Sequence, residues 1–156
     1  MKDYRLTMKE EERGIGEKVL NLWGVKKENM LSRDLFASVI KTFFKELDDV
    51  RDGGEQVNDG RLYARFYPSY FGMERDWFVR KSAEEITVFF ADDPIHKLEL
   101  LTELMYRDAF SLTDRDMQRI IFQKILQLYD IIDERSQEYS MARVNRAAGI
   151  QDFLNQ

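Results

Sequence analysis

Apolar residues recur along most of this chain three or four positions apart, the spacing that places side chains on one face of an α-helix. Residues 7–24 carry such a pattern, and Thr7 with Glu10 at its start can form a capping box. Residues 32–50 carry a second, wider apolar face, for which Ser32 is the expected N-cap. The pattern therefore predicts a helix over each of these two ranges.

The helical spacing stops at residues 51–60, "RDGGEQVNDG", where glycine, asparagine and aspartate gather. These residue types favour turns over helices, so we expect a flexible loop there. Helical spacing returns over 75–91 and predicts a third long helix. Strand-forming residues are concentrated at 85–91, "EITVFFA", so a β-strand over that segment is the alternative.

The C-terminal part of the chain carries clear helix start signals. Asp93 is placed to cap a helix that begins at Pro94, where the missing N–H of proline costs no hydrogen bond. Thr113 is the expected cap of the next helix, and the short connection makes 94–135 an antiparallel hairpin. Ser140 caps a last helix. The apolar side chains of that helix are Val144, Ala147, Ala148 and Phe153.

These patterns together predict an all-α fold. We expect a single domain over residues 1–156, built as a bundle of five or six helices with the antiparallel hairpin at its C-terminal end. A chain of this length buries about two thirds of its unfolded surface in one core. Its 44% hydrophobic and 34% charged residues are typical of a globular protein.

Part of the hairpin resembles a known family. The segment "TELMYRDAFSLTD" followed by "FQKILQLYD" is similar to a tetratricopeptide-like unit over about residues 97–130. Ile125 stands where that family has alanine, Ala109 stands roughly where it has glycine, and no second copy follows at the period of the repeat. The resemblance implies a helical hairpin that serves protein interaction, and it implies no active site.

Composition narrows the class of protein. The formal net charge is −5, and only residues 61–81 are basic, with five basic and two acidic side chains. A general nucleic-acid binder has a wider basic surface. The chain has no cysteine, no apolar run near the roughly 18 residues of a membrane helix, and no apolar signal-peptide core at its N-terminus. We therefore expect a cytoplasmic protein that binds neither nucleic acid nor a membrane.

Few residues are suited to catalysis. His96 is the only histidine, so a serine nucleophile would have to use it, and the glycine-rich loop lacks the lysine of a P-loop. A carboxylate–imidazole metal site at His96 is the alternative to an ordinary solvated helix start. The acidic residues nearby are Asp92, Asp93, Glu99 and Glu103. Di-iron bundles need two Glu-x-x-His units, and this chain has one histidine. We therefore expect no metal, no cofactor and no catalytic residue.

Residues 61–72, "RLYARFYPSYFG", combine five aromatic rings with two arginines. Such a mixture is typical of binding surfaces for proteins, and single-stranded nucleic acid can use the same chemistry. The candidate partner contacts are Arg61, Tyr63, Arg65, Tyr67 and Tyr70. The structural alternative is that the rings of 63–71 are buried while Arg61 and Arg65 stay outside, and this is what we expect, because burial of large apolar side chains is favourable. Pro68 should end any helical turn in this stretch.

The sequence as a whole favours a non-enzymatic protein-interaction or regulatory module. Its partner is expected to be another protein, and a homo-oligomer is the second possibility. The alternative function is that of a small helical enzyme, or of a nucleotide- or nucleic-acid-binding protein that uses the basic and aromatic residues of 61–81.

Overall fold

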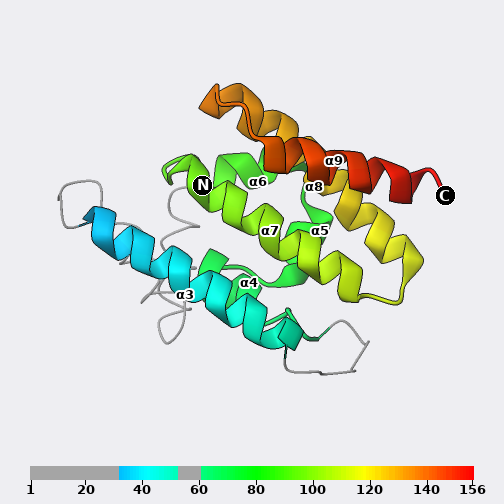
Figure 1. The fold of residues 1–156 in the computed structure, drawn as a ribbon, viewed down its shortest axis with the longest axis horizontal. Helices are drawn as coiled ribbons and strands as arrows, with labels where there is room; N and C mark the ends of the chain where they lie inside the picture. Colours follow the sequence, from blue (N-terminus) through cyan, green and yellow to red (C-terminus); the bar gives the residue numbers. More distant parts are fainter. Residues whose placement is uncertain (1–31, 53–60) are drawn as a thin grey trace. The chain divides into compact units, whose positions relative to one another are not determined.

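The computed structural model describes residues 32–52 and 61–156, with side chains described from residue 37 onward. Over these residues it contains seven helices and no strand (Figure 1), so the all-α prediction is confirmed. The helices are α3 (Ser32–Asp52), α4 (Phe66–Phe71), α5 (Arg75–Arg80), α6 (Ala83–Phe89), α7 (Ile95–Ser111), α8 (Arg115–Ser136) and α9 (Met141–Leu154). The helix predicted over 7–24, with Thr7 and Glu10 at its start, lies outside the described residues.

Helix α3 confirms the helix predicted over 32–50 and continues to Asp52. Ser32 is its first helical residue rather than a cap that precedes it. Arg51 and Asp52 thus belong to α3 and not to the expected loop, while 53–60 lie outside the described residues.

The described residues divide into two compact units. The first comprises 32–52 and 61–77, and the second comprises 78–156. The expectation of a single domain over 1–156 stays a prediction. In the first unit, Phe43 and Leu47 of α3 are fully buried, together with Phe66 of α4.

Helix α4 ends at Gly72, whose φ of 83° lies in the left-handed region that glycine adopts without a steric penalty. The N–H of Gly72 donates to the carbonyl of Pro68 at 3.2 Å. Pro68 was expected to end a helical turn, and this is wrong, because it lies in the first turn of α4. A proline there has no intrahelical hydrogen bond to lose.

The prediction of one long helix over 75–91 is wrong, because a new helix starts in its middle. Ser82 accepts a hydrogen bond from the N–H of Glu85 at 3.0 Å, and the N–H of Ser82 donates to the Glu85 carboxylate at 3.1 Å. This capping box separates α5 from α6. Because α6 runs through Phe89, the alternative strand over 85–91 is also wrong, and the extra helix starts bring the number of described helices to seven.

The antiparallel hairpin predicted over 94–135 is confirmed as the packed pair α7 and α8. Two of its caps are displaced by one residue. Pro94, with extended ψ of 149°, is the N-cap of α7 in place of Asp93. Asp114 is the N-cap of α8 in place of Thr113, and its carboxylate accepts from the N–H of Met117 at 3.1 Å.

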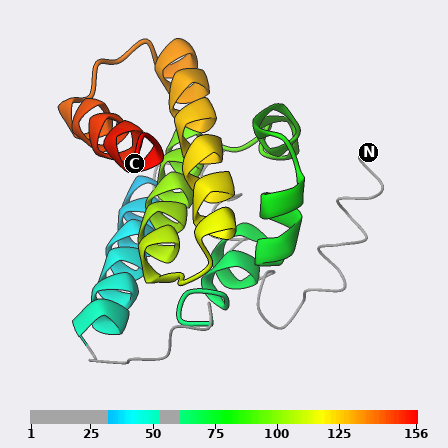
Figure 2. The same ribbon diagram turned by 90° about the vertical axis from the view of Figure 1, so that its right-hand side faces the viewer.

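Helix α8 is central to the second unit, since it packs against α7, α9 and α6. Figure 2 shows α9 beside α8. The cap predicted at Ser140 is confirmed, because its hydroxyl accepts from the N–H of Arg143. Of the apolar residues named for this helix, Val144 and Ala148 are exposed and Ala147 and Phe153 are half-buried, while Ile150 is the buried residue of α9.

Candidate functional site

The aromatic rings of the 61–72 segment are buried, as expected. The buried rings are Tyr63, Phe66, Tyr67, Tyr70 and Phe71. Those of Tyr70, Phe71 and Phe66 surround Phe43 of α3 edge-on, with ring centroids 5.0, 5.8 and 6.5 Å away. Edge-to-face contacts of this kind are favourable beyond the area that they bury. We call Phe43 and these five rings the aromatic cluster.

Arg61 and Arg65 are exposed, which was also expected. The guanidinium of Arg65 lies 4.3 Å from the centroid of the Phe66 ring, and its Nη1 lies 3.9 Å from Oε2 of Glu46. The Arg65 side chain is 61% exposed, so this ion pair contributes little to stability. Among the candidate contacts, only the two arginines are on the surface, because Tyr63, Tyr67 and Tyr70 are buried.

Tyr70 illustrates how polar atoms are satisfied inside the aromatic cluster. Its hydroxyl donates a hydrogen bond to Oε1 of Glu46 on α3. Burial raises the pKa of Tyr70 well above its usual range, and the hydrogen bond to Glu46 raises it further. The hydroxyl therefore stays protonated and serves as a fixed donor.

Lys124 on α8 has a structural role that the sequence did not indicate. Its Nζ donates to the carbonyl oxygens of Phe78 and Val79, at 3.3 and 2.5 Å, in the last turn of α5. Lysines at helix C-termini satisfy carbonyls that lack an intrahelical donor. Burial lowers the pKa of Lys124, because the charged ammonium loses hydration.

His96 lies at the second position of α7 and is exposed, as a solvated helix-start residue would be. Its Nδ1 is 2.8 Å from Oε1 of Glu99. Three of the carboxylates considered for a metal site pair with basic side chains instead: Glu99 binds Arg143, Glu103 binds Arg107 at 2.7 Å, and Oδ2 of Asp93 lies 3.6 Å from Nζ of the buried Lys97. Within 32–52 and 61–156, no group of three or more histidine or acidic side chains is arranged to hold a metal ion.

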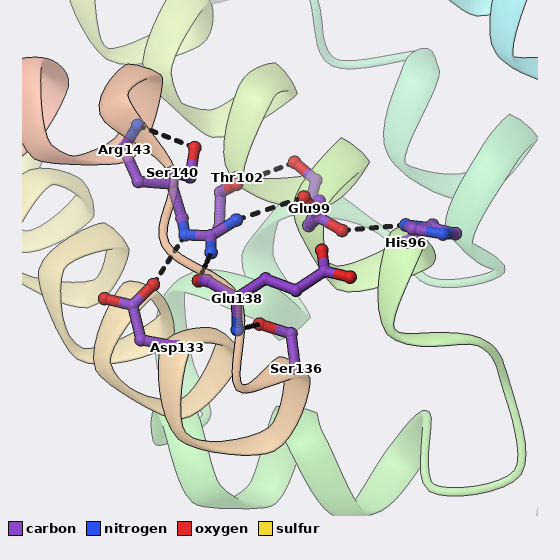
Figure 3. A network of polar contacts seen from close by, with 8 residues as sticks. All are labelled: His96, Glu99, Thr102, Asp133, Ser136, Glu138, Ser140 and Arg143. Carbon is purple, nitrogen blue, oxygen red and sulfur yellow. Dashed lines mark hydrogen bonds and ion pairs between the residues drawn. The ribbon is translucent and has the colours of Figure 1, made fainter.

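Arg143 joins three elements of the second unit (Figure 3). Its Nη1 donates to Oε2 of Glu99 on α7 at 3.1 Å, and its Nε donates to Oδ1 of Asp133 on α8 at 2.7 Å. Its Nη2 donates to the carbonyl of Glu138, just before α9, at 3.0 Å. The Arg143 side chain is only 11% exposed, so these charge-assisted bonds are partly shielded from water.

Arg146, one helical turn further along α9, makes a second connection to α7. It donates to Oε1 of Glu103, and its guanidinium lies 4.3 Å from the centroid of the Tyr106 ring. We call Arg143, Arg146 and their acidic partners the α9 clamp. Because the carboxylates of the clamp are bonded to guanidinium groups, this arrangement is suited to holding α9 in place rather than to acid–base catalysis.

The α9 clamp leaves the opposite side of the helix without charge over residues 141–149, and the exposed Asp152 follows in the last turn. Arg143 and Arg146 are the only charged residues in 141–151, and both bind residues of α7. The exposed residues of this stretch that form what we call the outer face of α9 are Met141, Ala142, Val144, Asn145, Ala148 and Gly149. Met141 is 58% exposed and Val144 45%, and Tyr139 just before the helix is 77% exposed. An uncharged exposed face is unusual in a chain with 34% charged residues.

Sequence reasoning missed both the clamp and the outer face. A signal was present in "MARVNRAAGIQ", residues 141–151, where the two arginines are three positions apart and so lie on one side of a helix. If that side faces the protein, the other side has only small, apolar and amide side chains. The apolar residues named for this helix, Val144, Ala147, Ala148 and Phe153, do not distinguish its two sides.

Comparison with known proteins finds no relative of this chain. No protein-family model, no curated protein and no solved structure matches the chain. None of the helices in the described part of the chain has the length and apolar character needed to span a bilayer.

Proposed function

We propose that this chain is a non-enzymatic protein-interaction module whose outer face of α9 binds a protein partner. The observation that carries the proposal is the exposure of Met141 and Val144 on the outer face, with the exposed Tyr139 just before the helix donating its hydroxyl to Sδ of Met141 at 3.7 Å. Exposed apolar side chains that gather on an uncharged face are favourable contacts for another protein. The lack of cysteine supports a cytoplasmic setting.

The α9 clamp supports the same proposal because it gives the outer face a fixed position. Arg143 connects α9 to both helices of the hairpin, and Arg146 adds a second connection to α7. A face held in this way loses little conformational entropy when it binds. In this proposal the hairpin, including the tetratricopeptide-like residues 97–130, is the scaffold that presents α9.

The test is affinity capture of proteins from the source cells with three tagged forms of the chain: the parent, Val144→Glu and Gln123→Glu. Val144 lies on the outer face, whereas Gln123 is an exposed residue of α8 outside it, so both variants add one negative charge to the surface. Circular dichroism should give the same helical content for all three. We expect at least one captured protein, which can be an untagged copy of the chain, to bind the parent and Gln123→Glu but not Val144→Glu. Capture of the same proteins by all three forms would overturn the proposal.

A thermal-shift screen with nucleotides and metabolites tests the alternative function. A ligand that binds only the native state raises the unfolding temperature. A shift that disappears when Arg61 and Arg65 are both changed to alanine would favour nucleotide binding by the 61–81 segment over the proposal made here. The module proposed here predicts no such shift.

A further inference from the structure

Helix α9 contacts the hairpin of α7 and α8 through side chains that recur along one side of it. These side chains are Arg143, Arg146, Ile150 and Phe153, which are three, four and three positions apart. Residues at these intervals share one side of a helix, and helices that dock on the surface of another protein use anchors at the same intervals. Ile150 is the only buried residue of α9. The helix is therefore attached in the manner of a bound helical ligand rather than of a core helix.

The hairpin meets the arginines of α9 with carboxylates. Nη1 of Arg143 lies 3.1 Å from Oε2 of Glu99 on α7, and its Nε lies 2.7 Å from Oδ1 of Asp133 on α8 (Figure 3). Arg146 donates to Oε1 of Glu103, one turn further along α7. The two arginines and the two glutamates thus pair in the same order along α9 and α7, which sets the direction of the bound helix.

The C-terminal end of α9 contacts an aromatic ring and an arginine of α8. The Phe153 ring lies 4.9 Å from the Phe122 ring, and Nη2 of Arg119 donates to the carbonyl of Leu154 at 2.9 Å. The last carbonyls of a helix lack intrahelical donors, so this arginine recognises a helix end. We call the residues of α7 and α8 that bind α9 in these ways the helix-binding face: Glu99, Glu103, Arg119, Phe122 and Asp133.

We propose that the helix-binding face is a site for a helix of a partner protein, and that α9 occupies it when the partner is absent. The partner helix carries two arginines three positions apart, an aliphatic residue four positions further and an aromatic residue three positions after that, as α9 does. This inference goes beyond the proposed function, because the partner replaces α9 instead of binding to its outer face.

The contacts of α9 suit a helix that can be exchanged. The side chains of Glu99 and Asp133 are 36% and 53% exposed, so their ion pairs with Arg143 can break and re-form in contact with water. Helices α7 and α8 pack directly on each other, and α8 also packs on α6, so the face keeps this support when α9 leaves. The carboxylates would then add negative charge to the surface of a chain of net charge −5, which favours a replacement that again supplies two arginines.

Helix α9 competes with any partner because it is tethered to the face. Only residues 137–140 separate it from α8, and a short flexible connection gives an effective concentration of roughly millimolar. A partner replaces α9 when its concentration, multiplied by its advantage in affinity, exceeds that value. A free peptide with the sequence of α9 has no such advantage, so at roughly millimolar concentration it should displace about half of the tethered helix.

Hydrogen exchange measured by NMR on the ¹⁵N-labelled parent tests this replacement. An unlabelled peptide of residues 137–156, at roughly millimolar concentration, should make the α9 amides of the labelled chain exchange at least about tenfold faster, while the amides of α7 and α8 stay protected. A peptide with Arg143→Ala and Arg146→Ala is the control and should leave the exchange unchanged. Unchanged exchange with the parent peptide, or equal acceleration by both peptides, would overturn the inference.

Fluorescence anisotropy of the labelled parent peptide tests the position of the site. The full chain with Arg143→Ala and Arg146→Ala should bind this peptide at least about tenfold more tightly than the parent chain does, because its own α9 competes less. Adding Glu99→Gln and Glu103→Gln to that chain should abolish the gain. Binding that survives the loss of both glutamates would place the peptide elsewhere and overturn the site. If the arginine variant does not fold, the exchange experiment on the parent chain decides.

The proposed function and this inference fail separately. Val144 lies on the outer face and is 45% exposed, so a peptide with Val144→Glu should displace the tethered helix as the parent peptide does. Loss of a captured protein in the Val144→Glu chain tests the outer face alone. A Val144→Glu peptide that fails to displace α9 while the parent peptide succeeds would contradict the set of anchors proposed here.

Discussion

Helices α4 and α9 are held in place by different means. Helix α4 has six residues, and four of them are buried aromatic side chains. Helix α9 has 14 residues, of which only Ile150 is buried. Arg143 and Arg146 bind carboxylates of α7 and α8, the Phe153 ring lies 4.9 Å from that of Phe122 on α8, and the carbonyl of Leu154 accepts from Arg119 at 2.9 Å. Neither helix is long enough to be stable alone in water, so each depends on these contacts.

The difference shows what each mode of attachment permits. Buried rings stabilise α4 through apolar area, but they leave little of its surface for another molecule. Ion pairs and the contact of Phe153 with Phe122 hold α9 by one side, so the other side is available for binding. Removing charged groups from water costs free energy, and the attraction within a partly exposed ion pair recovers only part of that cost. We therefore expect α9 to detach more easily than α4.

The largest expected effect lies in the aromatic cluster. Phe66→Ala removes a fully buried ring that contacts Phe43 and Tyr70, so it should lower the free energy of unfolding by about 3–5 kcal/mol. Arg65→Ala is the control, and because its side chain is 61% exposed it should change stability by less than about 0.5 kcal/mol. Urea unfolding of both variants and the parent makes the measurement. If Phe66→Ala unfolds like the parent, the cluster does not stabilise the first unit.

The next effect concerns the α9 clamp. Arg143→Ala removes hydrogen bonds to two carboxylates and a carbonyl, which should destabilise α9 by about 1.5–3 kcal/mol. The lower end is expected because the Glu99 and Asp133 side chains are 36% and 53% exposed. Hydrogen exchange should then be faster in α9 while the core of α7 and α8 stays protected. Arg135→Ala, at an exposed position in the last turn of α8, should leave exchange in α9 unchanged. Equal exchange in both variants would mean that α9 is held by other contacts.

Much of the fold followed from local patterns in the sequence. The apolar periodicity of α3 and α8 correctly predicted two long helices, and the short connection between α7 and α8 correctly predicted the hairpin. The break at Ser82 was missed because apolar spacing continues across it, although Ser82 and Glu85 have the spacing of a capping box. Here a local signal that ends one helix and starts another was outweighed by a longer-range periodicity.

The candidate site was harder to predict because its contacts join distant residues. Arg143 and Glu99 are 44 positions apart, and Arg146 and Glu103 are 43 positions apart. Periodicity within one helix indicates which residues share a side, but not whether that side faces the protein or the solvent. Over residues 141–149 of α9 the charged side is turned toward the protein and the uncharged side is exposed, which is the reverse of the usual amphipathic arrangement; only in the last turn is a charged residue, Asp152, exposed.

A third prediction uses pH to examine a buried tyrosine of the second unit. Burial raises the pKa of Tyr129 to about 12, whereas tyrosine in an unfolded chain titrates near pH ~10. The stabilisation from its neutral hydroxyl is fully present below pH ~10 and is lost as the pH rises toward 12. At pH ~11 the loss should be about 1.4 kcal/mol, which corresponds to one pKa unit.

Urea unfolding of the parent and of Tyr129→Phe at pH 9 and pH 11 measures this loss. The variant should lose less stability over the interval than the parent does. Tyr139→Phe is the control, because Tyr139 is 77% exposed, and it should follow the parent. The same pH dependence in all three proteins would show that Tyr129 ionises in the folded chain as it does in the unfolded one.

The smallest effect concerns the capping box between α5 and α6. Ser82→Ala removes the hydroxyl that accepts from the N–H of Glu85, and it should lower the free energy of unfolding by about 1 kcal/mol. Ser82→Thr keeps an accepting hydroxyl and should retain most of the stability. The hydrogen bond from the Ser82 N–H holds the pKa of Glu85 below its usual value. The stabilisation from this carboxylate is therefore present above the ordinary pKa of glutamate, and it is lost as the pH falls through the lowered pKa of Glu85. Urea midpoints at neutral pH compare the three proteins. If Ser82→Ala unfolds at the parent's midpoint, the start of α6 does not depend on its cap, and packing of Ile86 and Phe78 in the second unit must set the break instead.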